Sequence, residues 1–450
     1  MSVYASLAFY LAAGPVSAAL GLKSFLVLGA LCKLCTRAIL IWGSSIHAMR
    51  LMQVLFAAGG ASDLILFAYL YSDPDASESA PARTDVAYRA ATGAVSAASL
   101  GAYTVAAELG QLAFDAGASY ESLFYVSFVS VGLGVVAGLA LPDDGKADAD
   151  GEDAKASSAA AIAQNLMVPS SPRARVSRRV SRALGRAWTR TRACYASSAV
   201  KALSLWWVLG TAPWAFVENY GTNLFDAVDP DADANGHITF FARGLMAAAA
   251  AAAAMAPARV AASPWTYAAA SAATGAAAAA MASASTSTGA ATAYCAALAS
   301  TQCAACLAYA QTALASDAHA ASRAEVDAED EYDGETVAGS NPGSSDVAAR
   351  DAHAFLFGAN GALSLFALVA LQAIVHLARV DVRAQMRAAA VVCFVAAGGT
   401  LVAAGVRKAT GASWGFAPKT NHAGARAATA MSQSDGDGRR LLAGGEMSSA

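Results

Sequence analysis

The sequence predicts an all-α integral membrane protein. Of its 450 residues, 56% are hydrophobic and only 14% are charged, and the mean hydropathy is +0.43; soluble domains carry roughly 25% charged residues. Long apolar runs recur along the chain, and in a bilayer such runs are helices because lipid offers the backbone no hydrogen-bond partner. The net charge of −3 is divided among loops, so a nucleic-acid partner is not expected.

A search with a window of about 19 residues predicts eleven membrane-spanning helices. Five precede a long polar segment and six follow it. The seventh to ninth spans are rich in alanine and therefore only weakly hydrophobic. The predicted spans are residues 3–22, 24–46, 49–72, 90–114, 120–141, 199–225, 238–257, 262–284, 289–315, 353–377 and 387–406.

The long polar segment divides the chain into two hydrophobic halves. It starts acidic and ends in a cluster of arginines between Arg173 and Arg192, which predicts a cytoplasmic location. Two hydrophobic halves joined by such a linker are the outline of a two-bundle transporter. The predicted parts are an N-terminal bundle (1–141), a disordered cytoplasmic linker (142–196), a C-terminal bundle (197–410) with a disordered acidic insert (316–350), and a disordered tail (411–450).

One acidic residue, Asp63, lies in the middle of the apolar third span. A carboxylate at that depth is costly, so a polar cavity or a partner is expected beside it. At about 100° per residue, Gln53, Phe56, Gly60, Asp63 and Phe67 share one arc of the helix. This face is therefore a candidate lining of such a polar cavity.

Two further acids, Glu108 and Glu218, also fall inside predicted spans. Arg243, early in the seventh span, is the candidate partner of Glu218. A structural ion pair and proton coupling both remain open as roles for these three residues.

No motif in the sequence predicts an enzyme, a cofactor or a metal site. A phosphate-binding GxxxxGK[ST] loop is absent, and no hydrolase constellation stands out. The CxxC pairs Cys32–Cys35 and Cys303–Cys306 lack a second His/Cys pair nearby, so they are predicted to be buried packing thiols.

Four segments resemble a known family in both halves of the chain. They are HAMRLMQVLFAAGGASDLILFAYLYS (47–72), SLGAYTVAAELGQL (99–112), SLWWVLGTAPWAFVENYGTNLFD (204–226) and FLFGANGALSLFALVALQAIV (355–375). In order and spacing they resemble the reduced folate and thiamine carriers, vitamin solute carriers of the major facilitator superfamily. The resemblance implies twelve spans and a multi-pass protein of the plasma membrane. Because Met1 falls almost at the start of what resembles the second helix, the first family helix is expected to be missing.

The resemblance also implies a vitamin pocket. Asp63 matches a position that resembles Glu in the thiamine carriers and Arg in the folate carrier. The resemblance therefore implies that the negative charge of Asp63 favours a cationic substrate. Gln53 and Phe56 depart from the Glu and Tyr of the thiamine pattern. Tyr103 and Asn219 match residues that line the thiamine site.

The ninth span lacks the basic residue that helps the family hold an anionic folate, because Leu298 stands there. We therefore expect thiamine or a similar small organic cation as substrate, moved by alternating access. A reduced-folate-type anion carrier and a truncated, non-transporting scaffold or receptor of the same fold remain the alternatives. The expected partners are a small vitamin and the lipid bilayer, and the sequence does not predict the oligomeric state.

Overall fold

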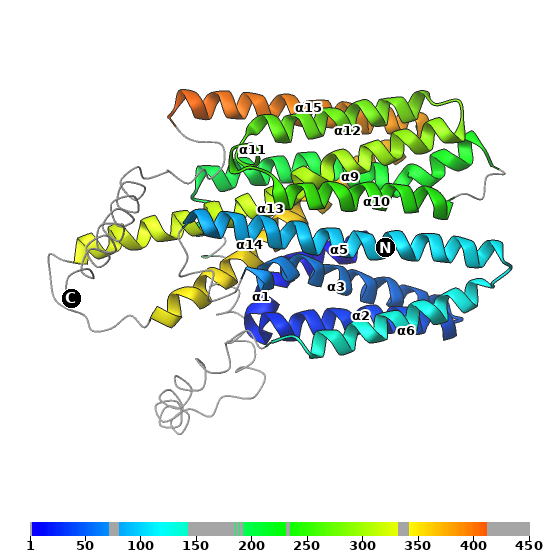
Figure 1. The fold of residues 1–450 in the computed structure, drawn as a ribbon, viewed down its shortest axis with the longest axis horizontal. Helices are drawn as coiled ribbons and strands as arrows, with labels where there is room; N and C mark the ends of the chain where they lie inside the picture. The colour runs from blue at the N-terminus through cyan, green and yellow to red at the C-terminus, as the bar shows by residue number, and fades with distance from the viewer. Residues whose placement is uncertain are drawn as a thin grey trace, which may run out of the picture. The chain divides into compact units, whose positions relative to one another are not determined.

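The computed structural model describes residues 2–71, 81–142, 185, 189, 192–230, 235–331 and 342–411, and these ranges contain no strand. All of them belong to one unit, Met1–Phe416. Within these ranges, eleven long helices and the one-turn α11 follow one another along the chain (Figure 1). They are α1 (Ser2–Leu20), α2 (Leu22–Trp42), α3 (Ile46–Leu70), α5 (Pro81–Asp115), α6 (Tyr120–Leu139), α9 (Ser198–Val228), α10 (Asn235–Met255), α11 (Ala258–Ala261), α12 (Pro264–Ser283), α13 (Ser287–Glu331), α14 (Pro342–Leu377) and α15 (Val382–Ala409).

The long helices agree in number and order with the predicted spans, so the all-α membrane fold is confirmed. Among the described residues, eight helices are long and apolar enough to cross a membrane: α2, α3, α6, α9, α10, α13, α14 and α15. Helix α1 is apolar but shorter. Charged and polar residues lower the hydropathy of α5, and Ser, Thr, Tyr and Trp residues lower that of α12.

The acidic insert 316–350 differs from its predicted disorder over much of its length. Helix α13 continues to Glu331 and α14 already begins at Pro342. Alanine and glutamate are strong helix formers, and this propensity outweighs the polarity on which the prediction rested. Residues 332–341, most of the linker and the tail from residue 412 lie outside the described residues.

The two halves of the sequence meet along several helix pairs. In the first half α2 packs against α3 and α6, and α1 packs against α3. In the second half α12 lies against α13 and α15, while α9 lies against α13, α14 and α15. The halves meet where α1 and α3 pack on α14 and where α5 packs on α10 and α13. Helix α5 therefore has its main neighbours in the second half, although it belongs to the first half by sequence (Figure 1).

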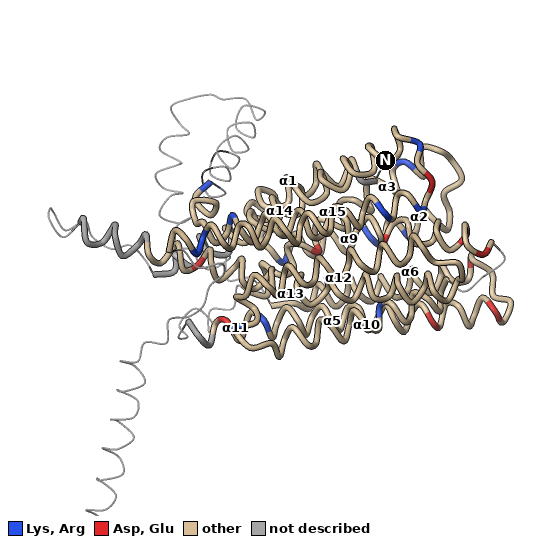
Figure 2. The backbone as a smooth tube through the Cα atoms, turned by 90° about the horizontal axis from the view of Figure 1, so that it is seen from above, with Lys and Arg blue, Asp and Glu red and all other residues tan. Residues whose placement is uncertain are grey.

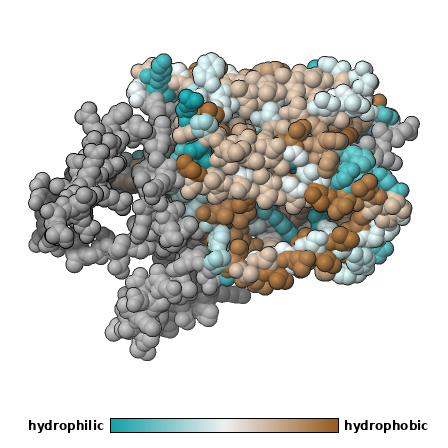
Figure 3. All heavy atoms as spheres, viewed as in Figure 1, coloured by the Kyte–Doolittle hydropathy of each residue, from teal (hydrophilic) through white to brown (hydrophobic). Residues whose placement is uncertain are grey.

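The side chains that point outward from the helices are mostly apolar. On α6 the exposed side chains include Val126, Val129, Leu133 and Val136. Apolar colours cover most of the described face in Figure 3, and most charged residues lie toward helix ends in Figure 2. An apolar surface of this extent suits a lipid environment, as expected for a multi-pass membrane protein.

The helix ends define two sides of the unit. The linker side carries the end of α6 and the start of α9, and the far side carries the α5–α6 and α9–α10 connections (Figure 1). On the linker side, Tyr195 donates a hydrogen bond of 2.5 Å to Oδ1 of the buried Asn360 on α14. Burial raises the pKa of Tyr195 to about 12, which further favours the protonated phenol that donates this bond.

Close contact between α5 and α10 depends on Gly93. A Cβ atom at this position would lie 2.7 Å from the Ala250 carbonyl oxygen and 2.6 Å from the Ala254 Cβ. On the same helix, a Cβ atom at Gly101 would meet nothing within 4 Å.

Replacing Gly93 with Ala is expected to lower the midpoint of thermal unfolding, because the backbone of α10 has to move to admit the methyl group. Such overpacking costs about 1–3 kcal/mol. The matched Gly101→Ala variant is expected to be neutral or more stable by up to about 1 kcal/mol, since alanine favours the helix. Thermal unfolding of the purified variants in detergent measures both effects, and equal midpoints would contradict this account of the interface.

Candidate functional site

A cavity of about 340 Å³ lies between helices of the two halves. Its walls come from α1, α3, α5, α9, α13 and α14. Six aromatic side chains line it: Tyr10, Phe67, Trp206, Trp207, Trp214 and Tyr309. Hydroxyl and amide groups of Ser96, Thr211, Gln302 and Ser364 are interspersed among the rings. A concave, mostly apolar space with a few polar groups is the usual character of a small-molecule site.

The rings of this cavity are held in place by their own contacts. Tyr309 packs against Trp207 at 4.0 Å and against Phe67 at 4.5 Å between ring centroids. The indole N–H of Trp206 donates to the backbone oxygen of Tyr267, and that of Trp214 donates to the backbone oxygen of Leu298, both at 3.1 Å. The aromatic walls are therefore fixed in position before any ligand binds.

Asp63 forms an ion pair with Lys33 of α2. Lys33 Nζ lies 2.5 Å from Asp63 Oδ1, and the two side chains are 37% and 63% exposed. Asp63 does not line the aromatic cavity, but Leu64 and Phe67, its neighbours on α3, do. The carboxylate therefore lies close to the cavity and its charge is balanced by an ammonium group.

Lys33 is a residue that the sequence reasoning missed. Its signal was available, because a lysine inside an apolar span is as costly as an aspartate and needs a partner. The pairing weakens the argument that a lone negative charge selects cations, because the pair has no net charge. Its ammonium can attract an anion and its carboxylate a cation.

The other predicted pocket residues do not line the cavity either. Gln53 is half-buried on α3, and its Oε1 has no hydrogen-bond partner among the described residues. Phe56, Tyr103 and Asn219 are exposed. The predicted arc on α3 thus brings only Phe67 to the cavity, which lies toward α9 and α13.

Glu218 and Arg243 form an ion pair between α9 and α10. The Arg243 guanidinium also lies over the Tyr103 ring of α5, with 5.6 Å from Cζ to the ring centroid. Arg243 thereby connects Tyr103 to the second half by a cation–π contact. The geometry is that of a structural pair, and a role in proton coupling stays a prediction.

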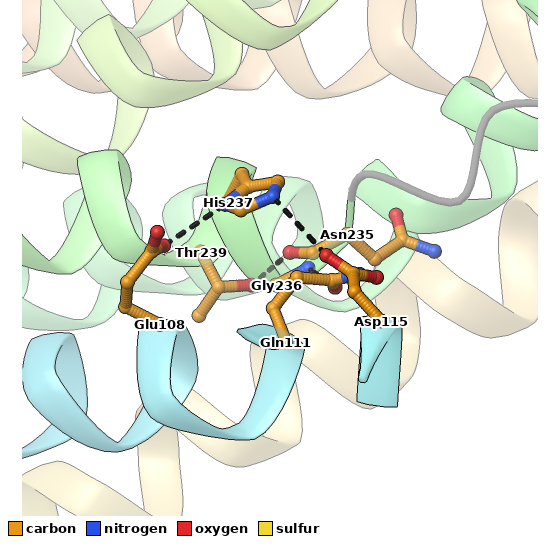
Figure 4. Close-up of polar contacts among 7 residues, drawn as sticks. All are labelled: Glu108, Gln111, Asp115, Asn235, Gly236, His237 and Thr239. Carbon is orange, nitrogen blue, oxygen red and sulfur yellow. Dashed lines mark hydrogen bonds and ion pairs between the residues drawn. The ribbon is translucent and has the colours of Figure 1, made fainter. Parts of the chain in front are cut away.

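Glu108 belongs to a polar cluster on the far side, between the end of α5 and the start of α10 (Figure 4). Its Oε2 lies 3.0 Å from Nδ1 of His237, and Nε2 of His237 lies 3.8 Å from Oδ2 of Asp115. Gln111 accepts a hydrogen bond from the backbone N–H of Gly236 at 3.0 Å and donates one to Asp115 at 2.9 Å. We call these five residues the far-side clasp.

A buried ionic network connects α5 to α13 on the linker side. Arg89 donates two hydrogen bonds to Asp85, at 3.0 and 2.8 Å, and the side chains are only 6% and 2% exposed. Gln311 of α13 donates to the same carboxylate at 3.2 Å. A burial this complete is tolerated because each group is paired and hydrogen-bonded.

Nearby, Asp317 joins three helices. It accepts a hydrogen bond of 3.1 Å from the Tyr88 hydroxyl of α5, and its Oδ1 lies 2.7 Å from Nε2 of His353 on α14. The halves are thus connected by polar contacts on both sides of the aromatic cavity.

The cysteines form no disulfide, since all seven are free. Cys306 is buried as predicted, but Cys35 is exposed on α2. Among the described residues, no group of three or more His, Cys, Asp or Glu side chains is placed to hold a metal ion.

Comparisons with known proteins agree with this architecture. A family profile described as "Reduced folate carrier" matches residues 1–305. The curated protein named "Folate transporter 1" from Caenorhabditis elegans is 27% identical over 227 residues, which are 48% of this chain and 47% of that protein. The chain thus spans about half the length of this relative in the match.

Two solved structures are similar in fold. The human organic anion transporter MFSD10 (TETRAN) has a TM-score of 0.54 and 12% identity, covering 89% of this chain and 81% of its own. The proton:xylose symporter XylE has a TM-score of 0.50 and 11% identity, covering 89% and 84%. At these identities the likeness shows the fold alone, which is that of the major facilitator superfamily. The fold and the sequence match together show that this chain belongs to the reduced folate carrier family, whose members are carriers and not enzymes.

Proposed function

We propose that the protein carries a folate-type vitamin, a flat heterocycle with an anionic tail, across a membrane by alternating access. The observation that carries this proposal is the cavity of six aromatic rings between the two halves. Membership of the reduced folate carrier family and the name of the nematode relative support the vitamin class.

The cavity suits a flat ring system for physical reasons. Aromatic walls stack on a planar heterocycle, and the hydroxyl and amide groups of Thr211, Gln302 and Ser364 can bond its polar edges. Lys33 places an ammonium group beside the same part of α3, where it can attract a carboxylate. Leu298 is buried, and its backbone oxygen accepts a hydrogen bond from Trp214, so its side chain supplies no positive charge. The anionic tail of a folate would therefore depend on Lys33.

Thiamine or a similar organic cation is the second candidate. Asp63 is more exposed than Lys33, so its carboxylate is the more accessible partner for a positively charged ring. Aromatic rings also favour cations through cation–π contacts. The two candidates therefore differ in which member of the Lys33–Asp63 pair the vitamin uses.

Alternating access would require the polar contacts on the two sides to open in turn. The far-side clasp and the linker-side network each join α5 to the second half. We propose that the linker side faces the cytoplasm, because its arginine cluster obeys the positive-inside tendency. The plasma membrane is the proposed location, and a non-transporting scaffold is the outcome if no uptake is found.

Uptake by cells that lack their own vitamin carriers tests the proposal. Cells expressing the full chain are expected to accumulate a labelled reduced folate. An excess of unlabelled folate should compete, whereas thiamine and pyridoxine should compete weakly. Strong competition by thiamine would favour the cation candidate, and no uptake of either vitamin would favour a scaffold.

Filling the cavity is expected to stop uptake. Ala305 of α13 lines the cavity, so Ala305→Trp puts an indole into the proposed binding space. Ala296 lies on the same helix but is exposed, which makes Ala296→Trp the matched control. The Ala305 variant should lose at least about tenfold in uptake, since each tenfold corresponds to about 1.4 kcal/mol of binding, with unchanged surface expression. Equal uptake by both variants would place the substrate elsewhere.

A further inference from the structure

The far-side clasp contains the ingredients of a proton-binding site. His237 lies between Glu108 and Asp115, two carboxylates that are seven residues apart and therefore on one face of α5 (Figure 4). The imidazole is 41% exposed, so protons from the far-side compartment can reach it. Histidine is the side chain whose charge changes most readily between about pH 5 and 8.

The two ring nitrogens of His237 have different partners. Nδ1 is at hydrogen-bond distance from Glu108, at 3.0 Å, and Nε2 faces Asp115 at 3.8 Å. A neutral imidazole has a single N–H, so when it donates to Glu108 it turns a lone pair toward the Asp115 carboxylate. A protonated imidazole donates from both nitrogens and attracts both acids.

Gln111 and Gly236 hold α5 and α10 close together at the clasp. Gln111 holds Asp115 on one side and the backbone of Gly236 on the other. A Cβ atom at Gly236 would lie 2.6 Å from the Gln111 Cβ, so only glycine permits this approach of α10 to α5.

Several neighbouring groups on this side of the unit have partners of their own, while Asp226 of α9 and Glu121 of α6 are exposed. Arg243, further along α10, pairs with Glu218 of α9 and covers Tyr103 of α5. At the end of α9, Asp229 accepts a hydrogen bond of 2.8 Å from Ser287. Helix α13 brings Cys295, whose Sγ lies 3.9 Å from the Ile238 backbone oxygen. The charge balance at the clasp is therefore set mainly by His237 and its two acids.

We propose that Glu108, His237 and Asp115 form a proton-binding site that holds α5 against α10 when His237 is protonated. A fall in far-side pH closes the clasp, and a rise in pH releases it. The far-side opening of the carrier thus depends on the pH of that compartment. The consequence for uptake rests on the proposed function, but the movement of the helices does not.

Distance measurements between α5 and α10 test this site without any vitamin. Leu112 and Phe241 are exposed on these two helices and lie outside the clasp, so each can carry a spin label on an unnatural amino acid in the full chain in vesicles. The label-to-label distance is expected to be short and narrow at pH 5.5 and longer and broader at pH 8.0. The ratio of closed to open populations should change about tenfold, the effect of one charge-assisted hydrogen bond.

Two variants and one control make the test decisive. His237→Gln should remove the pH response, and Asp115→Asn, which keeps the imidazole, should reduce it. The control His47→Gln/His376→Gln removes two exposed far-side histidines and should respond to pH as the unmodified chain does. A distance that does not change with pH in the unmodified chain, or a full response in His237→Gln, would overturn the proposal. Loss of vitamin uptake with the pH response intact would count against the proposed function alone.

Discussion

Lys33→Gln is expected to reduce uptake of a reduced folate by at least about tenfold, while Asp63→Asn is expected to reduce it much less. Without the ammonium, the Asp63 carboxylate beside the cavity is unbalanced and repels an anionic tail. At about 4 Å and an effective dielectric constant near 20, two unit charges interact by about 4 kcal/mol, and partial exposure of this pair reduces that value. For a cationic vitamin the opposite is expected: Asp63→Asn reduces uptake strongly, and Lys33→Gln reduces it much less.

Initial uptake rates over a range of folate and thiamine concentrations measure this preference. Arg50→Gln, which removes an exposed positive charge at the start of α3, serves as the charge-matched control. The double variant Lys33→Gln/Asp63→Asn separates two causes. If the loss comes from the uncompensated carboxylate, the double variant regains folate uptake; if folate contacts Lys33 directly, it does not. Unchanged uptake of both vitamins in both single variants would remove this pair from substrate selection.

Asp85→Asn is expected to destabilise the protein by about 3–5 kcal/mol, because it leaves the Arg89 guanidinium buried without a counter-ion. The same change weakens the bond from Gln311, so the contact between α5 and α13 also suffers. The expected observation is a large fall in the midpoint of thermal unfolding in detergent, or failure to accumulate in the membrane.

Removing both charges is expected to be far less harmful. The double variant Asp85→Leu/Arg89→Met replaces the pair with apolar side chains, which is often neutral or stabilising. It also removes the hydrogen bond from Gln311 to the Asp85 carboxylate, which costs about 1.5–3 kcal/mol. Asp226→Asn removes an exposed acid from α9 and should change the midpoint by less than about 0.5 kcal/mol. If Asp85→Asn were as mild as Asp226→Asn, the network would not be buried as the structure places it.

These networks show why the candidate site was only partly predictable. The sequence identified Asp63, Glu108 and Glu218 as costly acids and named a partner for Glu218 alone. The partners of the other two are Lys33, 30 residues away, and His237, 129 residues away. Single-sequence reasoning can state that a buried charge needs a partner, but it cannot choose among distant candidates.

The aromatic cavity illustrates the same limit. Its rings come from α1, α3, α9 and α13, and only Phe67 lies on the predicted face of α3. Periodicity shows which residues share a face of one helix, but the direction of that face depends on how the helix rotates against its neighbours. The exposed positions of Phe56, Tyr103 and Asn219 follow from those rotations.

The amino-acid sequence by itself determined the membrane class, the number of long helices and their order. Each depends on local properties, because the length of an apolar run and the absence of water in lipid leave the backbone one solution. The tertiary structure alone decided that α5 packs on the second half, that Lys33 neutralises Asp63, and that six rings surround one cavity. These features join residues far apart in the chain, and their geometry is set by packing between helices, which no local pattern encodes.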